Sequence, residues 1–132
     1  MLQKTKLLLI IVSLTILTGC GFNNESKESN HETPTTSELQ EMINQESDLV
    51  VLDVRTESEY LSGHIPNAIL LPYDQISEQA EASLPDKDAK IIVYCHSGRR
   101  SAIATKELTA LGYTNIYNFG AISNWTSELA TK

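Results

Sequence analysis

The sequence predicts an α/β protein in which helices flank a mainly parallel β-sheet. Two apolar runs, at residues 49–52 and 91–94, have the length of strands and lack the alternation of polar and apolar residues that half-exposed strands show. Such runs are typical of parallel strands that are buried on both faces. Segments with helical spacing of apolar residues lie between and after the runs, and this alternation favours a sheet covered by helices.

The first 19 residues have the pattern of a signal peptide. Two lysines precede an uncharged apolar run at residues 7–17, and this run of about eleven residues is shorter than the roughly 20 that a membrane-spanning helix needs. The next residues, Leu17-Thr18-Gly19-Cys20, resemble the bacterial lipobox, in which the cysteine receives lipid. We therefore expect residues 1–19 to be removed and Cys20 to carry acyl chains such as palmitate. The alternative is an ordinary signal peptide followed by an unrelated cysteine.

A polar segment rich in Ser, Asn and Glu follows at residues 20–36. It cannot bury enough apolar surface to offset the entropy lost on ordering, so we expect a flexible tether at the extracytoplasmic face of the cell membrane. The folded domain is expected at residues 37–132, a length that allows one core. Without the two lysines of the leader, 8 Lys and Arg remain against 17 Asp and Glu, and the formal charge of −9 disfavours a nucleic-acid partner.

The other elements of the domain are predicted from caps and apolar spacing. Thr35 and Glu38 stand at the spacing of a capping box, and apolar residues after them recur at helical intervals, which predicts a helix at residues 37–45. Gly112 stands where a helix at residues 101–111 would end with a C-cap. The same patterns predict further helices at residues 57–61, 73–83 and 123–129 and a short strand at residues 116–118.

Cys95 ends the second apolar run and begins a loop, residues 95–101, with the sequence Cys-His-Ser-Gly-Arg-Arg-Ser. In sheets of this kind ligands bind at the carboxyl ends of the strands, where Asp53 and Cys95 both lie. Gly98 can adopt a positive φ, which allows the loop amides to turn toward one centre and form an anion-binding nest. Helix N-termini and cations lower the pKa of a thiol, so we expect Cys95 to be largely a thiolate at neutral pH.

The two arginines of the loop add fixed positive charge. We expect Arg100, the last position before the predicted helix, to direct its charge at the Cys95 sulfur, and Arg99 to reach solvent and the far end of a bound substrate. Cys95 could instead be a small buried core residue, as free cysteines often are. The cysteine count argues against this, because a lipidated Cys20 leaves Cys95 without a disulfide partner in an oxidising compartment.

The chain resembles rhodanese domains through several motifs that occur in the order and spacing of that family. The motifs are Asp53-Val54-Arg55, Gly63-His64-Ile65-Pro66-Asn67-Ala68, Tyr94-Cys95-His96-Ser97-Gly98-Arg99-Arg100-Ser101, Gly112-Tyr113 and Trp125. The cysteine loop is the most specific of them, and the resemblance covers residues 37–132. One departure is Gly120-Ala121, where the family often has two glycines before its last helix.

The resemblance implies a rhodanese-like fold with a five-stranded parallel sheet between helices. It also implies a persulfide on Cys95 and transfer of sulfane sulfur from a donor, such as thiosulfate, a polysulfide or a persulfide, to an acceptor such as cyanide, a small thiol or a protein. The active-site loop that binds substrate would comprise His96, Ser97, Gly98, Arg99, Arg100 and Ser101. Asp53 and Arg55 would support the neighbouring loops through hydrogen bonds and ion pairs.

Two other functions fit parts of the pattern. Cysteine-dependent phosphatases also hold an anion around a thiolate, but their arginine is the sixth residue after the cysteine, whereas Arg100 is the fifth residue after Cys95 and Ser101 is the sixth. The shorter loop favours a pocket for a sulfur atom over one for a phosphate ester. The second alternative is a rhodanese-like interaction or sulfur-sensing module without appreciable turnover, although such modules often lack the cysteine.

No cofactor or metal is expected, because the three histidines are scattered and the sequence contains no Gly-rich nucleotide fingerprint. We expect His64 to be a hydrogen-bonded turn residue and Trp125 to belong to the core, while His96 could tune the thiolate or face solvent. The expected partners are a small sulfur donor and acceptor and, through the lipid, the membrane. We expect the chain to be a monomer.

Overall fold

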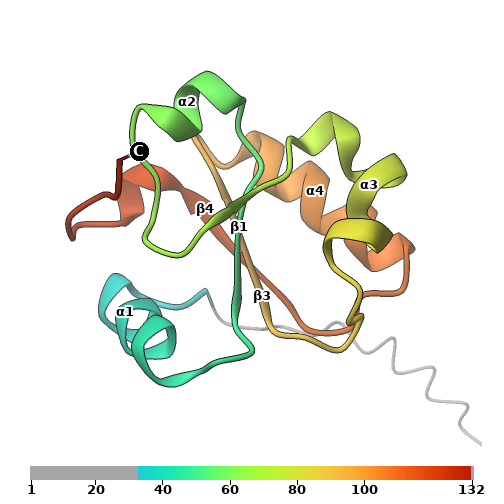
Figure 1. The fold of residues 1–132 in the computed structure, drawn as a ribbon, viewed down its shortest axis with the longest axis horizontal. Helices are drawn as coiled ribbons and strands as arrows, with labels where there is room; N and C mark the ends of the chain where they lie inside the picture. The colour runs from blue at the N-terminus through green and yellow to red at the C-terminus, as the bar shows by residue number, and fades with distance from the viewer. Residues whose placement is uncertain (1–32, 132) are drawn as a thin grey trace, which may run out of the picture.

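The computed structural model describes residues 33–131 and has the α/β architecture that the sequence predicts (Figure 1). Its parallel sheet has the spatial order β2-β1-β3-β4. The strands are β1 (Val50–Asp53), β2 (Ile69–Leu70), β3 (Ile91–Cys95) and β4 (Ile116–Ala121). The expected signal peptide, Cys20 and residues 20–32 of the expected tether lie outside the described residues.

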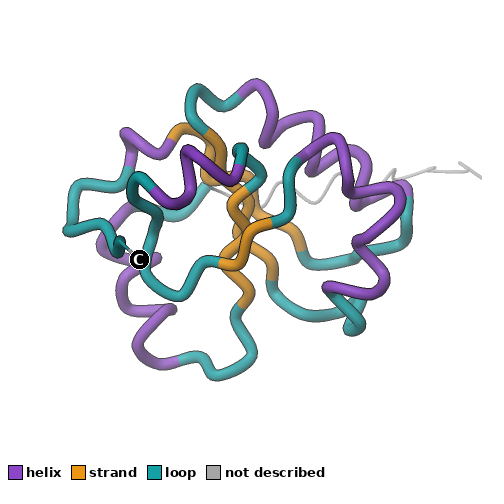
Figure 2. Tube along the Cα trace, turned by 45° about the horizontal axis from the view of Figure 1, so that its top comes forward, coloured by secondary structure: helices purple, strands orange, loops and turns teal. Residues whose placement is uncertain are grey.

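Helices cover both faces of the sheet, and Figure 2 shows the strands in the centre of the domain with helices around them. The α-helices are α1 (Thr36–Gln45), α2 (Glu57–Leu61), α3 (Ile76–Ser83) and α4 (Arg99–Ala110), and the 3₁₀ turns are η1 (Tyr73–Gln75) and η2 (Ile122–Asn124). None of the helices within residues 33–131 is long and apolar enough to cross a membrane.

β3 is buried on both faces, which explains its unbroken apolar sequence. One set of alternate residues, which includes Val93 and Cys95, packs against residues of α3 and α4. The other set, Ile92 and Tyr94, packs with Leu39 of α1 on the opposite face. Because side chains alternate along a strand, the residue before the cysteine and the cysteine itself belong to different halves of the core.

Three helix predictions need correction. α4 begins at Arg99 rather than at residue 101, because Gly98 adopts a left-handed conformation (φ 93°) and ends the loop early. The predicted helix at residues 73–83 is divided between η1 and α3. The predicted helix at residues 123–129 does not form beyond η2 in the described chain. Ala130 instead exchanges two backbone hydrogen bonds with His64, and the Trp125 indole donates to the carbonyl of Glu128.

The sheet has four strands within residues 33–131, one fewer than expected. Thr33 reaches the edge strand β4 through a side-chain hydrogen bond, and Thr36 of α1 reaches η2 in the same way. The Thr33 hydroxyl donates to the carbonyl of Asn118 at 3.1 Å, and the Thr36 hydroxyl donates to the carbonyl of Asn124. Pro34 between them has no N–H to donate to a strand ladder.

Candidate active site

Cys95 is the last residue of β3, and its free thiol is fully buried. The chain leaves the strand, turns through residues 96–98 and enters α4 directly, so that the amides at the start of the helix surround the sulfur. The Gly98 amide donates to the Cys95 Sγ at 3.0 Å. A left-handed glycine is needed here because other residues avoid this backbone conformation, which turns the Gly98 N–H back over the cysteine.

The surroundings of Cys95 lower the pKa of its thiol below the ordinary value. Burial is the largest single influence and raises the pKa, but hydrogen bonds from the Ser101 backbone and side chain and from the Gly98 and Ser97 amides outweigh it. The Ser101 hydroxyl also lies 2.9 Å from the Gly98 carbonyl, and its single proton can serve only one of these acceptors at a time. Backbone amides therefore supply most of the lasting stabilisation of the thiolate.

The two arginines make different contacts, and neither lies in an irregular loop, since both belong to the first turn of α4. Arg100 forms two charge-assisted hydrogen bonds with Glu59 of α2, at 2.7 and 2.8 Å. The Arg100 guanidinium is therefore held by a carboxylate, whereas we expected it to direct its charge at the Cys95 sulfur. The Arg99 guanidinium lies over the ring of Tyr73, 5.9 Å from its centroid, and the Arg99 side chain is exposed.

A buried polar network lies beside the cysteine at the ends of β1 and β3. Asp53 is fully buried and accepts hydrogen bonds from the Arg55 side chain, the shortest at 2.6 Å, and from the Tyr94 hydroxyl at 2.7 Å. Arg55 also donates to the carbonyl of Gly63, and the Tyr94 hydroxyl accepts from the Ile65 amide. The network joins both strand ends to the turn at residues 63–65.

The network keeps Tyr94 neutral and engages the Asp53 carboxylate in hydrogen bonds. Burial, followed by the neighbouring Asp53 carboxylate, raises the pKa of Tyr94 well above its usual range, so the hydroxyl keeps its proton. Within the described residues, every hydrogen bond of the Asp53 carboxylate comes from Arg55 or Tyr94 and none from Cys95. This geometry fits the supporting role expected for Asp53 and Arg55.

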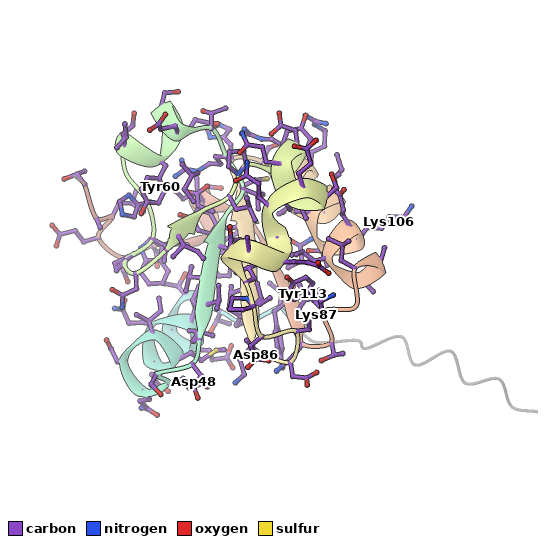
Figure 3. The ribbon with its side chains drawn as sticks, turned by 45° about the vertical axis from the view of Figure 1, so that its right-hand side comes forward. Asp48, Tyr60, Asp86, Lys87, Lys106 and Tyr113 are labelled. Carbon is purple, nitrogen blue, oxygen red and sulfur yellow. The ribbon has the colours of Figure 1, made fainter. Side chains whose placement is uncertain are left out.

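The histidines of the region lie where a turn and an exposed loop place them. The His64 ring stacks on Tyr60, labelled in Figure 3, at a centroid distance of 3.8 Å, and its Nδ1 lies 2.9 Å from the Tyr60 carbonyl. His96 and Ser97 are exposed directly after the cysteine. Within residues 33–131, no group of three or more His, Cys, Asp or Glu residues is placed to hold a metal ion.

The departure at Gly120-Ala121 is compatible with the loop geometry. Gly120 has a positive φ of 85°, and a side chain added at Gly98 would begin 3.9 Å from the Gly120 Cα. Ala121 has an ordinary extended conformation, with φ −84° and ψ 140°. Only the first of the two positions therefore requires glycine.

Glu59 and Tyr73 are site residues that the sequence analysis did not identify. Glu59 is separated from Arg100 by 41 positions, and no local spacing links the two. The Thr56-Glu59 capping box was the available signal, but it explains Glu59 as a helix cap alone. A hollow of about 630 Å³ between α1 and β4 is lined by no residue of the cysteine loop. The candidate active site is therefore identified from the groups around Cys95 and not from this cavity.

The fold and the site together define an α/β domain of the cysteine-loop class, with a thiol at the carboxyl end of a parallel strand and amides directed at it. The sequence model described as the rhodanese-like domain matches residues 35–128. The chain therefore belongs to the rhodanese-like family.

Relatives of the chain include named sulfurtransferases. The thiosulfate sulfurtransferase PspE of Escherichia coli is 34% identical over 73 residues, which cover 55% of this chain and 70% of that protein. The putative sulfurtransferase YtwF of Bacillus subtilis is 32% identical over 98 residues, which cover 74% of this chain and 93% of that protein. The family of the chain is thus one of rhodanese-like sulfurtransferases.

Solved structures agree with the fold. A rhodanese with anions from E. coli superimposes with a TM-score of 0.60 at 30% identity and covers 64% of this chain and 99% of that one. A rhodanese-like domain protein from Staphylococcus aureus superimposes with a TM-score of 0.63 at 32% identity and covers 76% of this chain and 97% of that one.

Proposed function

We propose that the protein is an extracytoplasmic sulfurtransferase that carries sulfane sulfur as a persulfide on Cys95. The observation that carries this proposal is the Gly98 amide 3.0 Å from the Cys95 sulfur, in a loop whose hydrogen bonds lower the pKa of the thiol. The thiolate is the nucleophilic form of cysteine. The kinship with a thiosulfate sulfurtransferase and the anions in the related E. coli rhodanese support an anionic sulfur donor.

The proposed reaction has two half-reactions, here written for thiosulfate. The Cys95 thiolate attacks the outer sulfur of thiosulfate, a new S–S bond forms, and the bond to the sulfonate sulfur breaks so that sulfite leaves with the electron pair. Cyanide or a thiolate then attacks the terminal sulfur of the persulfide, giving thiocyanate or a new persulfide and restoring the Cys95 thiolate. Polysulfides and small persulfides are the other donors that fit the same chemistry.

The loop amides assist both half-reactions in the same way. They hold one negative charge at the sulfur position before the attack on the donor, and they hold the negative charge of the persulfide after it. Arg99 is the exposed first residue of α4 and has no carboxylate partner in the described part of the chain, and we assign it to the anionic end of the donor.

Intact mass spectrometry tests the persulfide directly. After incubation with thiosulfate and removal of small molecules, the wild-type domain should gain one sulfur atom, and the Cys95→Ser variant should gain none. Adding cyanide should remove the sulfur and release thiocyanate. A wild-type domain that folds but gains no sulfur from thiosulfate, polysulfide or a small persulfide would instead be an interaction or sensing module.

The phosphatase alternative is tested with an aryl phosphate. We expect no phosphate release above the uncatalysed background, because the loop is one residue too short for the phosphatase arginine position. Phosphate release that disappears in Cys95→Ser would contradict the sulfurtransferase proposal.

For the location, we propose that Cys20 is lipidated and anchors the domain to the outer side of the cell membrane. The support is the leader-like sequence before Cys20 and the polar segment after it. In an expressing bacterium, the wild-type chain should fractionate with membranes and Cys20→Ser should be released, since several acyl chains give stable attachment. If Cys20→Ser stays entirely with membranes after a carbonate wash, lipid on this cysteine is not the anchor.

A further inference from the structure

Glu59 is the carboxylate on which two parts of the site converge. Its oxygens accept hydrogen bonds from the Thr56 amide and hydroxyl, at 3.0 and 2.9 Å, which close the N-terminal turn of α2. The same carboxylate accepts hydrogen bonds from both terminal nitrogens of the Arg100 guanidinium. The side chains of Glu59 and Arg100 are 28% and 16% exposed, so the pair is partly shielded from water.

This pairing balances the positive charge of one of the two adjacent arginines and not that of the other. The positive charge of Arg100 is matched by a carboxylate at hydrogen-bonding distance. The contact found for Arg99 is the ring of Tyr73, which has no formal charge to cancel that of the guanidinium. In the described residues, the first turn of α4 therefore presents one compensated guanidinium and one uncompensated guanidinium beside Cys95.

We propose that Glu59 is a positioning residue that holds the Arg100 guanidinium and cancels its charge beside the Cys95 loop. In this arrangement Arg100 ties α2 to α4, and the charge that a substrate meets is mainly that of Arg99. Glu59 acts through Arg100, since within the described residues its carboxylate bonds to Thr56 and Arg100 and not to the sulfur.

Charge cancellation matters because Arg100 and the Cys95 thiolate interact electrostatically. An uncompensated Arg100 would lower the pKa of the thiol further, and a thiolate of lower pKa is a weaker nucleophile. The rate constant of a fully ionised thiol falls by about threefold for each pH unit by which its pKa is lowered. Glu59 thus keeps the ionised Cys95 thiolate a stronger nucleophile than the cationic loop sequence alone would allow.

Other charged groups also meet at this end of the sheet. They are Asp53 at the end of β1, Arg55 after it, Glu57 of α2, Asp74 of η1, and His96 and Arg99 around the cysteine. Glu57 offers a matched control, since it is exposed on the same helix as Glu59 and its side chain has no hydrogen bond or ion pair within residues 33–131.

The experiment measures the pKa of the Cys95 thiol from the pH dependence of iodoacetamide alkylation. Glu59→Gln should lower this pKa, because it leaves Arg100 uncompensated, and Arg100→Gln should raise it. The double variant should return toward wild type, since it removes both charges. Arg100→Lys keeps the charge and should lie nearer to wild type than Arg100→Gln does. Glu57→Gln should match wild type.

A purely structural role for the pair gives a different pattern. Loss of either partner would then loosen the loop amides, and both single variants would raise the thiol pKa without rescue in the double variant. That result, or an unchanged pKa in Glu59→Gln, would overturn the proposal. Far-ultraviolet circular dichroism and thermal unfolding check that each variant is folded. If Glu59→Gln does not fold, the thiol pKa values of Arg100→Gln and Arg100→Lys are compared, and equal values would overturn the proposal.

The effect on catalysis rests on the proposed sulfurtransferase function and is measured separately. In Glu59→Gln the half-saturating concentration of thiosulfate should fall, because a second uncompensated cation attracts the anion. At a pH where the thiol is fully ionised in both proteins, the maximal rate should fall with the weaker nucleophile. Alkylation needs no sulfur donor, so the charge proposal can hold even if no sulfur is transferred. If the domain transfers sulfur but Glu59→Gln and Arg100→Gln do not shift the thiol pKa in opposite directions, the sulfurtransferase function stands and the proposed role of Glu59 is wrong.

Discussion

Two adjacent residues, Arg99 and Arg100, have the same side chain and different surroundings. Arg100 is fixed by a carboxylate from another helix, whereas Arg99 is exposed and lies over an aromatic ring. A guanidinium without a fixed partner can turn toward an incoming oxyanion and bind it in two places. Arg99 is therefore the residue whose loss should weaken binding of an anionic donor.

Arg99→Ala should raise the half-saturating concentration of thiosulfate by roughly two- to fivefold, the loss that an exposed charge contact of up to about 1 kcal/mol gives. Arg99→Lys should recover part of the loss, since it keeps the charge without the planar fork. The matched control is Lys106→Ala, which removes the same charge from α4 at a side chain that points away from the domain (Figure 3). Equal saturation curves for Arg99→Ala and Lys106→Ala would contradict the assignment of Arg99 to the donor.

At the scale of elements, the ends of β1 and β3 and the turn after α2 are held in register by the Asp53, Arg55 and Tyr94 network. Its hydrogen bonds are buried, so breaking one leaves groups without a partner in an apolar setting. The cost of such an unpaired group is about 1–3 kcal/mol.

Tyr94→Phe should lower the free energy of unfolding by about 1–3 kcal/mol, because it leaves the Ile65 amide without its acceptor and removes one donor from Asp53. The measurement is urea unfolding followed by circular dichroism. Tyr73→Phe is the control, since the Tyr73 hydroxyl has no hydrogen bond among the described residues. A similar loss in both variants would show that the Tyr94 hydroxyl has no special part in stability.

The elements with the clearest local signals were predicted correctly, whereas a segment fixed by a distant contact was not. The Thr35-Glu38 capping box and the apolar runs before Asp53 and Cys95 correspond to α1, β1 and β3. The predicted helix at residues 123–129 was wrong, because pairing of Ala130 with His64 holds the end of the chain extended.

The same distinction applies to the site. Cys95 and Gly98 could be placed from the sequence because a strand, a glycine and a helix follow one another within a few residues. The pairing of Arg100 with Glu59 could not, since it depends on how α2 packs beside the start of α4. A cation in a loop indicates available charge, but its partner is known only once the elements are packed.

At the scale of the whole molecule, the Glu59 pair makes stability depend on pH. Hydrogen bonds from Arg100, more than any other influence, hold the pKa of the Glu59 carboxyl well below its usual range. A carboxyl whose pKa is lowered by folding stabilises the native state fully above its unfolded pKa of about 4.3. This contribution is lost as the pH falls from there through the folded value.

Thermal unfolding as a function of pH tests this prediction. The wild-type domain should unfold at a higher temperature than Glu59→Gln at pH 7, and the difference should shrink between about pH 5 and pH 2 as the wild-type carboxyl is protonated. Glu57→Gln should show no such convergence. Parallel curves for wild type and Glu59→Gln across the acid range would contradict the prediction.

The two edges of the sheet also bear on how crowded copies of the domain behave. β2 is only two residues long, and Thr33, directly before Pro34, forms a side-chain hydrogen bond to the opposite edge strand, β4. Long, flat, open edges are the places where chains add strands to one another and aggregate. A short strand on one side and a proline-containing segment on the other give neighbouring molecules little to extend, so we expect the domain to remain dispersed at high local concentration.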